Sequence, residues 1–285
     1  MKHPLIPTLG LAVLAGMSLV SPARAVVSID WTTIGNPGNA GSGAHTWYHP
    51  AGYGAVSYVY KIGTYDVTNA QYVEFLNAKG ASNSAGIYNS TMGHTGGSYN
   101  FGNIAQSGSS GSYKYSVSST YANQPVVGVT WFDAARFCNW LQNGQGSGDM
   151  ETGAYTLSGA TSGFVLANAD AQIRLPTQDE WQKAAFYNGA TGTYSFYPDG
   201  RNDITPSDAN YGYINMGLVN VNFGTPSSYG VYGMGGNAWQ WNDVIVNESR
   251  GLYGGGWGDN GNGLPSSGEA LVPPTLLSGD FSFRV

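Results

Sequence analysis

The sequence predicts one loop-rich globular domain in which three short helices are combined with short strands. Three observations support this fold class. Only 10% of the 285 residues are charged, whereas glycine (43) and tyrosine (20) are abundant, a composition more typical of loops and turns than of a helical bundle. Three segments carry helix-start signals. Neither a linker nor a fixed-period repeat divides the chain.

Residues 1–25 have the pattern of a secretory signal peptide. Lys2 and His3 precede the apolar run LGLAVLAGMSLV, and the segment SPARA ends in Ala23-Arg24-Ala25. This arrangement is typical of cleavage after the final alanine, and the apolar run is too short to span a bilayer comfortably. We therefore expect an exported protein that is periplasmic, cell-surface or secreted, without a membrane span in the mature chain.

The charge balance argues against a nucleic-acid partner. The chain has 11 basic and 17 acidic residues, for a formal net charge of -6. Loss of Lys2 and Arg24 with the signal peptide leaves nine basic residues and a net charge of -8. Proteins bind nucleic acid through basic patches that displace phosphate counterions, and no such patch is visible.

The first predicted helix lies in VTNAQYVEFLNAKG. Thr68 and Gln71 have the spacing of a capping box, Tyr72 and Phe75 fall on one face, and Gly80 is placed to end the helix. The preceding segment GAVSYVYKIGTYDV alternates well enough to predict one long strand or a strand pair.

The second predicted helix lies in PVVGVTWFDAARFCNWLQNG, after a short strand expected at Pro125 to Val129. Thr130 is the expected N-cap, with Asp133 in the first turn. Cys138 falls on the apolar face of this helix. It is the only cysteine, so no intramolecular disulfide can form. Between a reactive thiol and a small core residue, we favour the core residue, since no Lys or His neighbours it in sequence.

The third predicted helix lies in IRLPTQDEWQKAAFY. Thr177 and Glu180 repeat the capping-box spacing, and Trp181 and Ala184 face inward. Residues 81–123 and 143–171 are rich in Gly, Ser, Asn and Tyr and are expected to form extended surface loops.

Six motifs in order resemble the formylglycine-generating enzyme, or sulfatase-modifying factor, domain family. They are YKIGTYDVTNAQYVEFLNA, PVVGVTWFDAARFCNWL, IRLPTQDEWQKAAFY, YGVYGMGGNAWQWND, RGLYGGGWGDN and the terminal FSFRV. The resemblance covers residues 56–285, so we expect residues 26–55 to form an N-terminal extension packed on the domain. It implies an α+β fold with a C-type-lectin-like core and little regular secondary structure.

The resemblance also implies a redox activity. Family members of the founding type oxidise a cysteine of a sulfatase to formylglycine with oxygen and a copper ion held by two thiolates, the soft ligands that Cu(I) prefers. The positions that should be cysteine after the motif GGGW are Asp259 and Leu264. Neither supplies a thiolate, and Cys138 belongs to another motif. We therefore do not expect copper or the founding activity.

A calcium site is the second implication of the resemblance. The motif GMGGNAWQW retains Asn237 but has Gln240 where the family usually has glutamate, and SDANYGYI offers Asn210 and the Tyr211 carbonyl as part of a second site. The lost charge should weaken calcium binding. The alternative is a metal-free turn in which the Asn237 amide ties backbone groups together.

The segment RGLYGGGWGDNGNGLPSS is either a ligand-binding loop or a turn. Trp257, Asp259, Asn260 and Asn262 are its candidate ligand-binding residues. The sequence predicts a non-catalytic ligand-binding or structural module at the cell surface or in the periplasm, with glycans or cell-surface proteins as partners. The alternative is an oxidoreductase of the formylglycine-generating type, or another enzyme with an unrecognised site.

Overall fold

The computed structural model describes residues 26–43, 52–95, 99, 101–261, 264 and 268–285. The predicted signal peptide and Asn262 lie outside these residues. The helices are α1 (Asn69–Lys79), α2 (Trp131–Gln142) and α3 (Gln178–Phe186). Each begins with a capping box, formed by Thr68 with Gln71, Thr130 with Asp133, and Thr177 with Glu180. All three predicted helices are confirmed.

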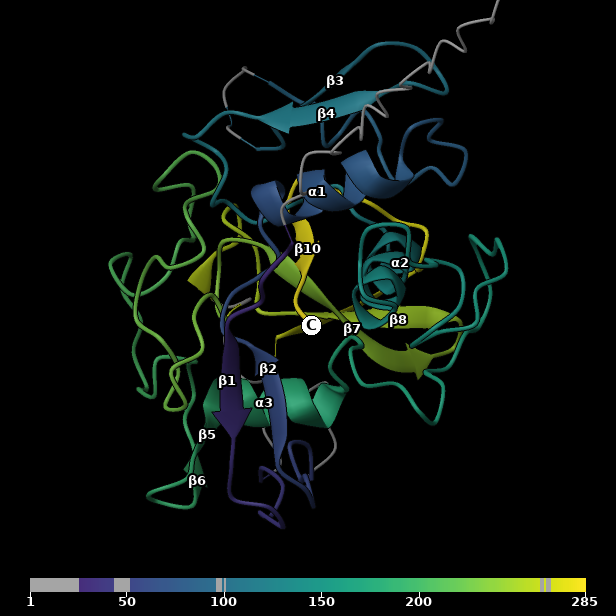
Figure 1. The fold of residues 1–285 in the computed structure, drawn as a ribbon. Coiled ribbons are helices and arrows are strands. Elements are labelled where there is room, and N and C mark those ends of the chain that lie inside the picture. Colours follow the sequence, from purple (N-terminus) through teal and green to yellow (C-terminus); the bar gives the residue numbers. More distant parts are fainter. Residues whose placement is uncertain (1–25, 44–51, 96–98, 100, 262–263, 265–267) are drawn as a thin grey trace, which may run out of the picture.

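The strands are short and form several small sheets (Figure 1). They are β1 (Trp31–Ile34), β2 (Tyr60–Gly63), β3 (Ile104–Ser107), β4 (Lys114–Val117), β5 (Tyr187–Asn188), β6 (Thr193–Tyr194), β7 (Trp239–Val246), β8 (Ser249–Tyr253), β9 (Glu269–Val272) and β10 (Phe281–Phe283). The largest sheet has the order β10-β7-β8-β9, in which β10 runs parallel to β7 and the other pairs are antiparallel. The structure thus combines helices and sheets around many loops.

Two strand predictions need correction. Only Tyr60–Gly63 of GAVSYVYKIGTYDV forms a strand, and its partner is the distant β1 rather than a neighbouring segment. The strand expected at Pro125 to Val129 is reduced to a single bridge between Thr68 and Pro125. Gly128 has a φ of 75° and donates its N–H to the Ser278 carbonyl, so the chain turns out of an extended path there.

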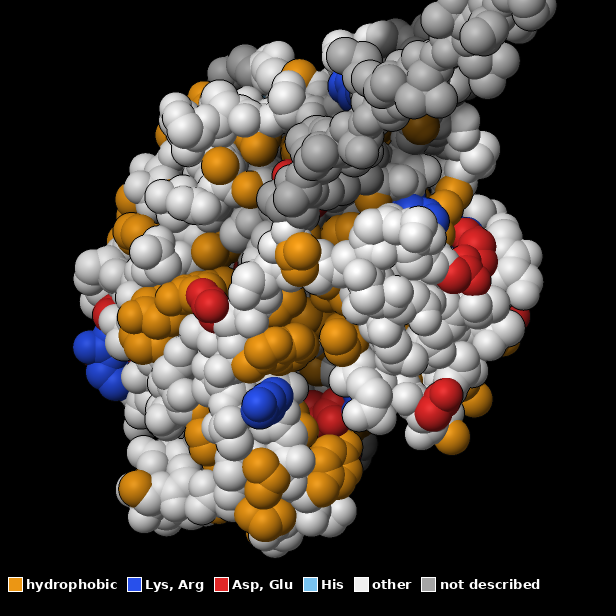
Figure 2. All heavy atoms as spheres, viewed as in Figure 1, with side chains coloured by type: hydrophobic (Ala, Val, Ile, Leu, Met, Phe, Trp, Pro, Cys, Tyr) orange, Lys and Arg blue, Asp and Glu red, His pale blue; other side chains and the backbone are white. Residues whose placement is uncertain are grey.

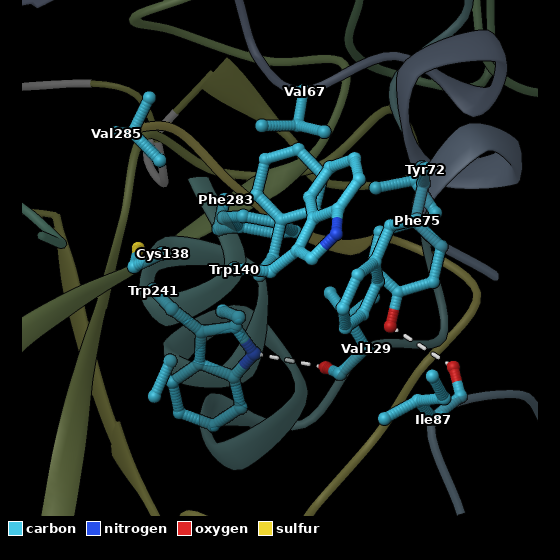
Figure 3. Close-up of a cluster of buried hydrophobic side chains, with 14 of the residues drawn as sticks. Val67, Tyr72, Phe75, Ile87, Val129, Cys138, Trp140, Trp241, Phe283 and Val285 are labelled. Atoms are coloured by element: carbon cyan, nitrogen blue, oxygen red, sulfur yellow. Dashed lines mark hydrogen bonds between the residues drawn. The ribbon is translucent and has the colours of Figure 1, made fainter. Parts of the chain in front are cut away.

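The main core lies where α1 and α2 meet the C-terminal strands (Figure 3). Tyr72, Phe137 and Phe283 have ring centroids 5.3–6.3 Å apart. The Trp241 indole N–H donates to the Val129 carbonyl at 2.9 Å, which satisfies a buried polar group. Cys138 has no exposed surface and burial raises the pKa of its thiol, so its prediction as a core residue rather than a reactive thiol is confirmed.

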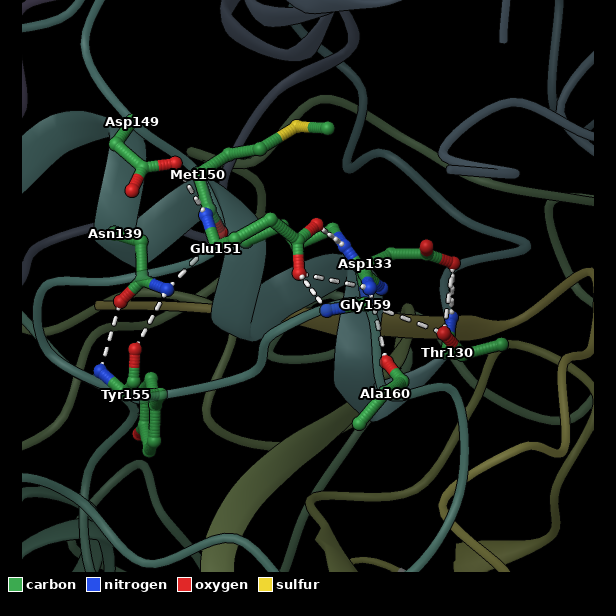
Figure 4. A network of polar contacts seen from close by, with 10 residues as sticks. Thr130, Asp133, Asn139, Asp149, Met150, Glu151, Tyr155, Gly159 and Ala160 are labelled. Atoms are coloured by element: carbon green, nitrogen blue, oxygen red, sulfur yellow. Dashed lines mark hydrogen bonds and ion pairs between the residues drawn. The ribbon is translucent and has the colours of Figure 1, made fainter. Parts of the chain in front are cut away.

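Polar side chains of α2 fasten the loop of residues 143–171 to the domain (Figure 4). Asn139 accepts from the Tyr155 N–H at 2.8 Å and donates to the carbonyls of Met150 and Tyr155 at 3.0 Å. Arg136 donates to Glu151 at 2.6 Å. This long loop is therefore packed by hydrogen bonds rather than by regular secondary structure.

A second core cluster joins α3 to the first strand pair. Ile34 of β1 and Ile62 of β2 pack in one buried cluster with Trp181 and Phe186 of α3. In Figure 1, α3 crosses behind these two strands. This packing holds the outer edge of β2 next to the segment that leads into α3.

Candidate functional site

Asn237, the first candidate calcium ligand, has both ends of its side chain bonded to protein. Its amide oxygen accepts from the Asn210 side chain at 3.0 Å and the Val219 N–H at 2.9 Å, while its amide nitrogen donates to the Val219 carbonyl at 3.0 Å. Asn237 has a φ of 68°, which asparagine tolerates in turns. The structure therefore brings Asn237 and Asn210 together, in the pattern of the turn alternative.

The side chain of Gln240 is also hydrogen-bonded to protein, and one of its donors is the Arg284 guanidinium. Its amide oxygen accepts from the Trp181 indole N–H and from Nε of Arg284, both at 2.7 Å, and its nitrogen donates to the Gly233 carbonyl. A calcium ion on this oxygen would stand beside a guanidinium, and like charges repel strongly in a buried site. In the described part of the chain, no three His, Cys, Asp or Glu side chains gather closely enough to hold a metal.

Tyr211 lies apart from these bonds. Its hydroxyl donates to the Ile204 carbonyl at 3.0 Å, and its own carbonyl accepts from the Ile214 N–H at 3.4 Å. Asn210 also accepts from the Asn215 side chain at 3.0 Å. The candidate ligands of the second calcium site thus already have protein partners, and calcium binding stays a prediction.

The segment after β8 closes on itself. One carboxylate oxygen of Asp259 accepts from the Gly256 N–H at 2.7 Å, and the Asp259 carbonyl accepts from the Gly212 N–H at 2.7 Å. Asn260 is exposed, whereas Leu264 has no exposed surface. At the two positions where the resemblance places copper-binding thiolates, the structure therefore has a carboxylate that caps a turn and a leucine that is buried.

Trp257 anchors this segment. It is 7% exposed, and its ring lies 5.0 Å from that of Tyr99 and 5.4 Å from that of Tyr213. Its indole nitrogen is buried without a hydrogen-bond partner in the described structure. Trp257, Asp259 and Asn260 do not line either of the two larger grooves described below.

A groove that sequence reasoning missed lies along the outer edge of β2. It has a volume of about 440 Å³ and separates Tyr58 to Ile62 from residues 171–176. We call it the β2-edge groove. Its lining residues are Trp31, Tyr58, Val59, Tyr60, Lys61, Ile62, Ala171, Gln172, Ile173, Arg174, Pro176, Glu180 and Val285. The alternation of residue types around Tyr58 indicated one wall of this groove. No local pattern indicated that residues 171–176 form the opposite wall.

An ion pair between Arg174 and Glu180 lies on the floor of the β2-edge groove. Arg174 donates to both carboxylate oxygens of Glu180, at 2.7 and 2.8 Å, and the Tyr58 hydroxyl donates to the same carboxylate at 2.9 Å. Burial alone would raise the pKa of Glu180, but the hydrogen bonds and charge of Arg174 hold it below its usual value. Glu180 is therefore ionised and already bound at neutral pH.

The rim of the groove is apolar and basic. Trp31, Tyr58 and Val59 are 38%, 48% and 55% exposed. Lys61 is exposed, and no carboxylate of the described residues forms an ion pair with it. In Figure 2, hydrophobic side chains gather around a hollow near β2 and α3 that has acidic atoms within it and basic atoms at its rim.

A second groove, of about 400 Å³, adjoins the first at Val285. It includes the exposed amide side chains of Asn123, Asn220 and Asn222 and the buried carboxylate of Asp66. Asp66 pairs with Arg284 at 3.0 Å. Among the described residues, no helix is both long and apolar enough to cross a membrane.

Comparison with known structures supports the fold. CarF has a TM-score of 0.60 and 21% identity, over 91% of this chain and 98% of CarF. Variable protein 1 of Treponema denticola has a TM-score of 0.61 and 21% identity, over 92% and 96% of the two chains. PvdO from Pseudomonas aeruginosa has a TM-score of 0.54 and 18% identity, over 90% of each chain. At these identities the likeness shows the fold alone.

Sequence comparison defines the family. Serine/threonine-protein kinase pkn1 of Chlamydia pneumoniae is 30% identical over 121 residues, which are 42% of this chain but only 14% of that protein. The profile of the Sulfatase-modifying factor enzyme 1-like domain matches residues 24–285. The resemblance and the α+β, loop-rich fold predicted from sequence are confirmed. The chain belongs to the sulfatase-modifying factor enzyme 1-like domain family.

Proposed function

We propose that this protein is an exported, non-catalytic member of its family that binds a ligand at the cell surface or in the periplasm. The observation that carries the proposal is the replacement of the thiolate pair. Asp259 caps a turn through the Gly256 N–H, and Leu264 has no exposed surface. Two-thiolate copper chemistry has no ligands at these positions.

Binding rather than chemistry is supported by the β2-edge groove. Its volume of about 440 Å³ falls within the range of ligand sites. Its rim offers the partly exposed rings of Trp31 and Tyr58, and aromatic side chains of this kind supply contact area at low entropic cost. The Arg174–Glu180 pair on its floor is engaged internally, which suits recognition better than acid–base catalysis.

The alternative function is an oxidoreductase of the formylglycine-generating type, favoured by the enzyme named in the family description. Residues 26–285 can be incubated with Cu(I), oxygen and a peptide that carries the sulfatase cysteine motif. We expect the mass of the peptide to stay unchanged, while a formylglycine-generating enzyme run in parallel converts it. Aldehyde formation by this chain would contradict the non-catalytic proposal.

The ligand-binding part of the proposal is tested separately. The same protein, fluorescently labelled, can be applied to an array of bacterial glycans and to displayed random peptides. We expect saturable binding to one of these classes, and loss of that binding on Trp31→Ala. Failure of both screens, together with concentration-dependent self-association, would favour a structural module of an extracellular matrix.

A further inference from the structure

The main-chain hydrogen bonds of β2 show which of its peptide N–H and C=O groups point away from β1. In the antiparallel register Trp31 lies opposite Gly63, and Thr33 lies opposite Lys61. Thr64, one step further, donates its N–H to the Asp30 carbonyl at 2.8 Å. Because bonded and non-bonded pairs alternate along an antiparallel ladder, the peptide groups of Gly63 and Lys61 point away from β1.

The first of these outward positions is already paired with another segment. The Gly63 N–H donates to the Val285 carbonyl at 2.6 Å, and the Gly63 carbonyl accepts from Arg284 at 2.9 Å. Further along, the Val67 N–H donates to the Phe283 carbonyl at 3.0 Å. Residues 283–285 therefore run antiparallel to residues 63–67, and one main-chain hydrogen bond joins them to the outer edge of β2.

The β2-edge groove lies along the same edge, on the side of Gly63 that leads toward the start of β2. Val285 lines the β2-edge groove together with Val59 and Lys61. In the described part of the chain, no main-chain or side-chain group bonds to the outward N–H and C=O groups of Lys61. A strand edge with free N–H and C=O groups is a template for pairing with another chain.

We propose that the β2-edge groove binds an extended peptide segment of a partner protein as an added strand. The peptide lies antiparallel to β2 and pairs with the N–H and C=O groups of Lys61. This inference rests on the proposed ligand-binding function and names its ligand class. A peptide suits the edge better than a glycan because outward groups recur every second residue, which is the repeat of a strand.

The side chains of the groove set the preferred peptide composition. Lys61 discourages indiscriminate pairing at an edge, and favours a peptide with a carboxylate next to it, since opposite charges on neighbouring strands attract. Trp31 and Tyr58 offer apolar surface to a β-branched or aromatic residue of the peptide. We therefore expect peptides that alternate acidic with β-branched or aromatic residues.

The test begins with random nine-residue peptides displayed on phage and selected against residues 26–285. We expect enrichment of the alternating composition. An enriched peptide is then synthesised and its affinity measured by fluorescence anisotropy for the wild type, Lys61→Gln and Lys61→Pro. Proline removes the outward N–H, whereas glutamine removes only the charge. We expect roughly tenfold weaker binding for Lys61→Pro and a smaller loss for Lys61→Gln.

Because Lys61→Pro can perturb folding, the pairing is also tested from the peptide side. Methylation of alternate backbone nitrogens blocks either the amides that face β2 or those that face away. We expect one methylation register to abolish binding to the wild type and the other to preserve it. Equal effects of the two registers, or full affinity of a folded Lys61→Pro variant, would overturn the inference.

Failure of this inference can be told apart from failure of the proposed function. If no peptide is enriched but a bacterial glycan binds and the Trp31→Ala variant does not bind it, the ligand-binding function stands and the added-strand inference is wrong. If the chain oxidises the sulfatase cysteine peptide, the proposed function itself is wrong.

Discussion

The turn around Asn237 and Gln240 and the β2-edge groove differ in how far their polar groups are bonded to protein. Around Asn237 and Gln240, each side-chain oxygen and nitrogen of these two residues is bonded to protein. Along β2, the outward peptide groups of Lys61 have no partner in the described structure, and the nearby Tyr58 ring is 48% exposed. A region whose polar groups satisfy one another stabilises a fold, while an edge with free groups can recognise another molecule.

The largest effect is expected from removal of the Arg284 guanidinium, which is bonded to Gln240. Arg284 is fully buried and donates to Gln240, Gly63 and the carboxylate of Asp66. Arg284→Met leaves the buried carboxyl group of Asp66 without its cationic partner, so we expect the free energy of unfolding to fall by about 3–5 kcal/mol. Urea denaturation followed by tryptophan fluorescence measures it.

The matched control for this variant is Arg201→Met. Arg201 also pairs with carboxylates, Asp199 and Asp208, but its side chain is 50% exposed. Solvent screening makes such pairs weak, so we expect a much smaller loss than for Arg284→Met. Equal losses for the two variants would show that Arg284 is not in a closed, dehydrated network.

The next effect is a pH dependence carried by Asp66. Burial raises its pKa to about 6 from an ordinary value of 3.8. A carboxyl group whose pKa is raised by folding adds stability below its unfolded pKa, and that stability is lost as pH rises through the folded pKa. We expect Asp66 to remove about 2 kcal/mol of unfolding free energy between pH 4 and pH 7.

Urea titrations at several pH values, compared between the wild type and Asp66→Asn, isolate this contribution. The variant has no carboxyl group to ionise, so its stability should change less over the same range. A wild-type protein that becomes more stable relative to Asp66→Asn as pH rises through 6 would contradict the expectation.

A smaller difference is expected from one substitution made in both regions. The Tyr72 hydroxyl is buried and donates to the Ile87 carbonyl at 2.9 Å, whereas Tyr58, at the groove rim, donates to Glu180 at 2.9 Å. Tyr72→Phe leaves a buried carbonyl unpaired and should cost about 1–3 kcal/mol. Tyr58→Phe should cost about 1 kcal/mol or less, since water and Arg174 still serve Glu180. Thermal denaturation of both variants decides whether the regions differ.

The smallest effect concerns calcium. The side-chain oxygens of Asn237, Gln240 and Asn210 already accept hydrogen bonds from protein donors, one of them a guanidinium. We therefore expect the melting temperature to be the same in about 1 mM calcium, where extracellular sites bind, as in a chelator. A calcium-dependent rise in melting temperature would show that these side chains rearrange around an ion.

Local signals in the sequence were enough to predict where the helices begin and which residues stand at positions 259 and 264. Each capping box involves residues three positions apart, so Thr68, Thr130 and Thr177 mark helix starts without knowledge of the fold. The resemblance places two thiolates at the positions of Asp259 and Leu264, and the sequence shows that neither residue is cysteine. That Asp259 caps a turn and that Leu264 is buried became known only from the structure.

Long-range pairing was not predictable from local patterns. The partner of β2 is β1, about 30 residues earlier, and its outer edge meets residues 283–285 at the other end of the chain. The strand expected at Pro125 to Val129 does not form, because the Gly128 N–H donates to the Ser278 carbonyl, far away in the sequence. The groove depends on such contacts, since Lys61 and Arg174 become neighbours only in the fold.

Residue-resolved hydrogen exchange of the native protein compares the two regions most directly. The Asn237 N–H donates to Asn210 at 2.7 Å and the Trp257 N–H donates to Asn237 at 3.0 Å, whereas the Lys61 N–H faces the groove. We predict slow exchange for Asn237 and Trp257 and fast exchange for Lys61. A protected Lys61 amide, or unprotected amides at Asn237 and Trp257, would contradict the difference between the fully bonded turn at Asn237 and the open edge of β2.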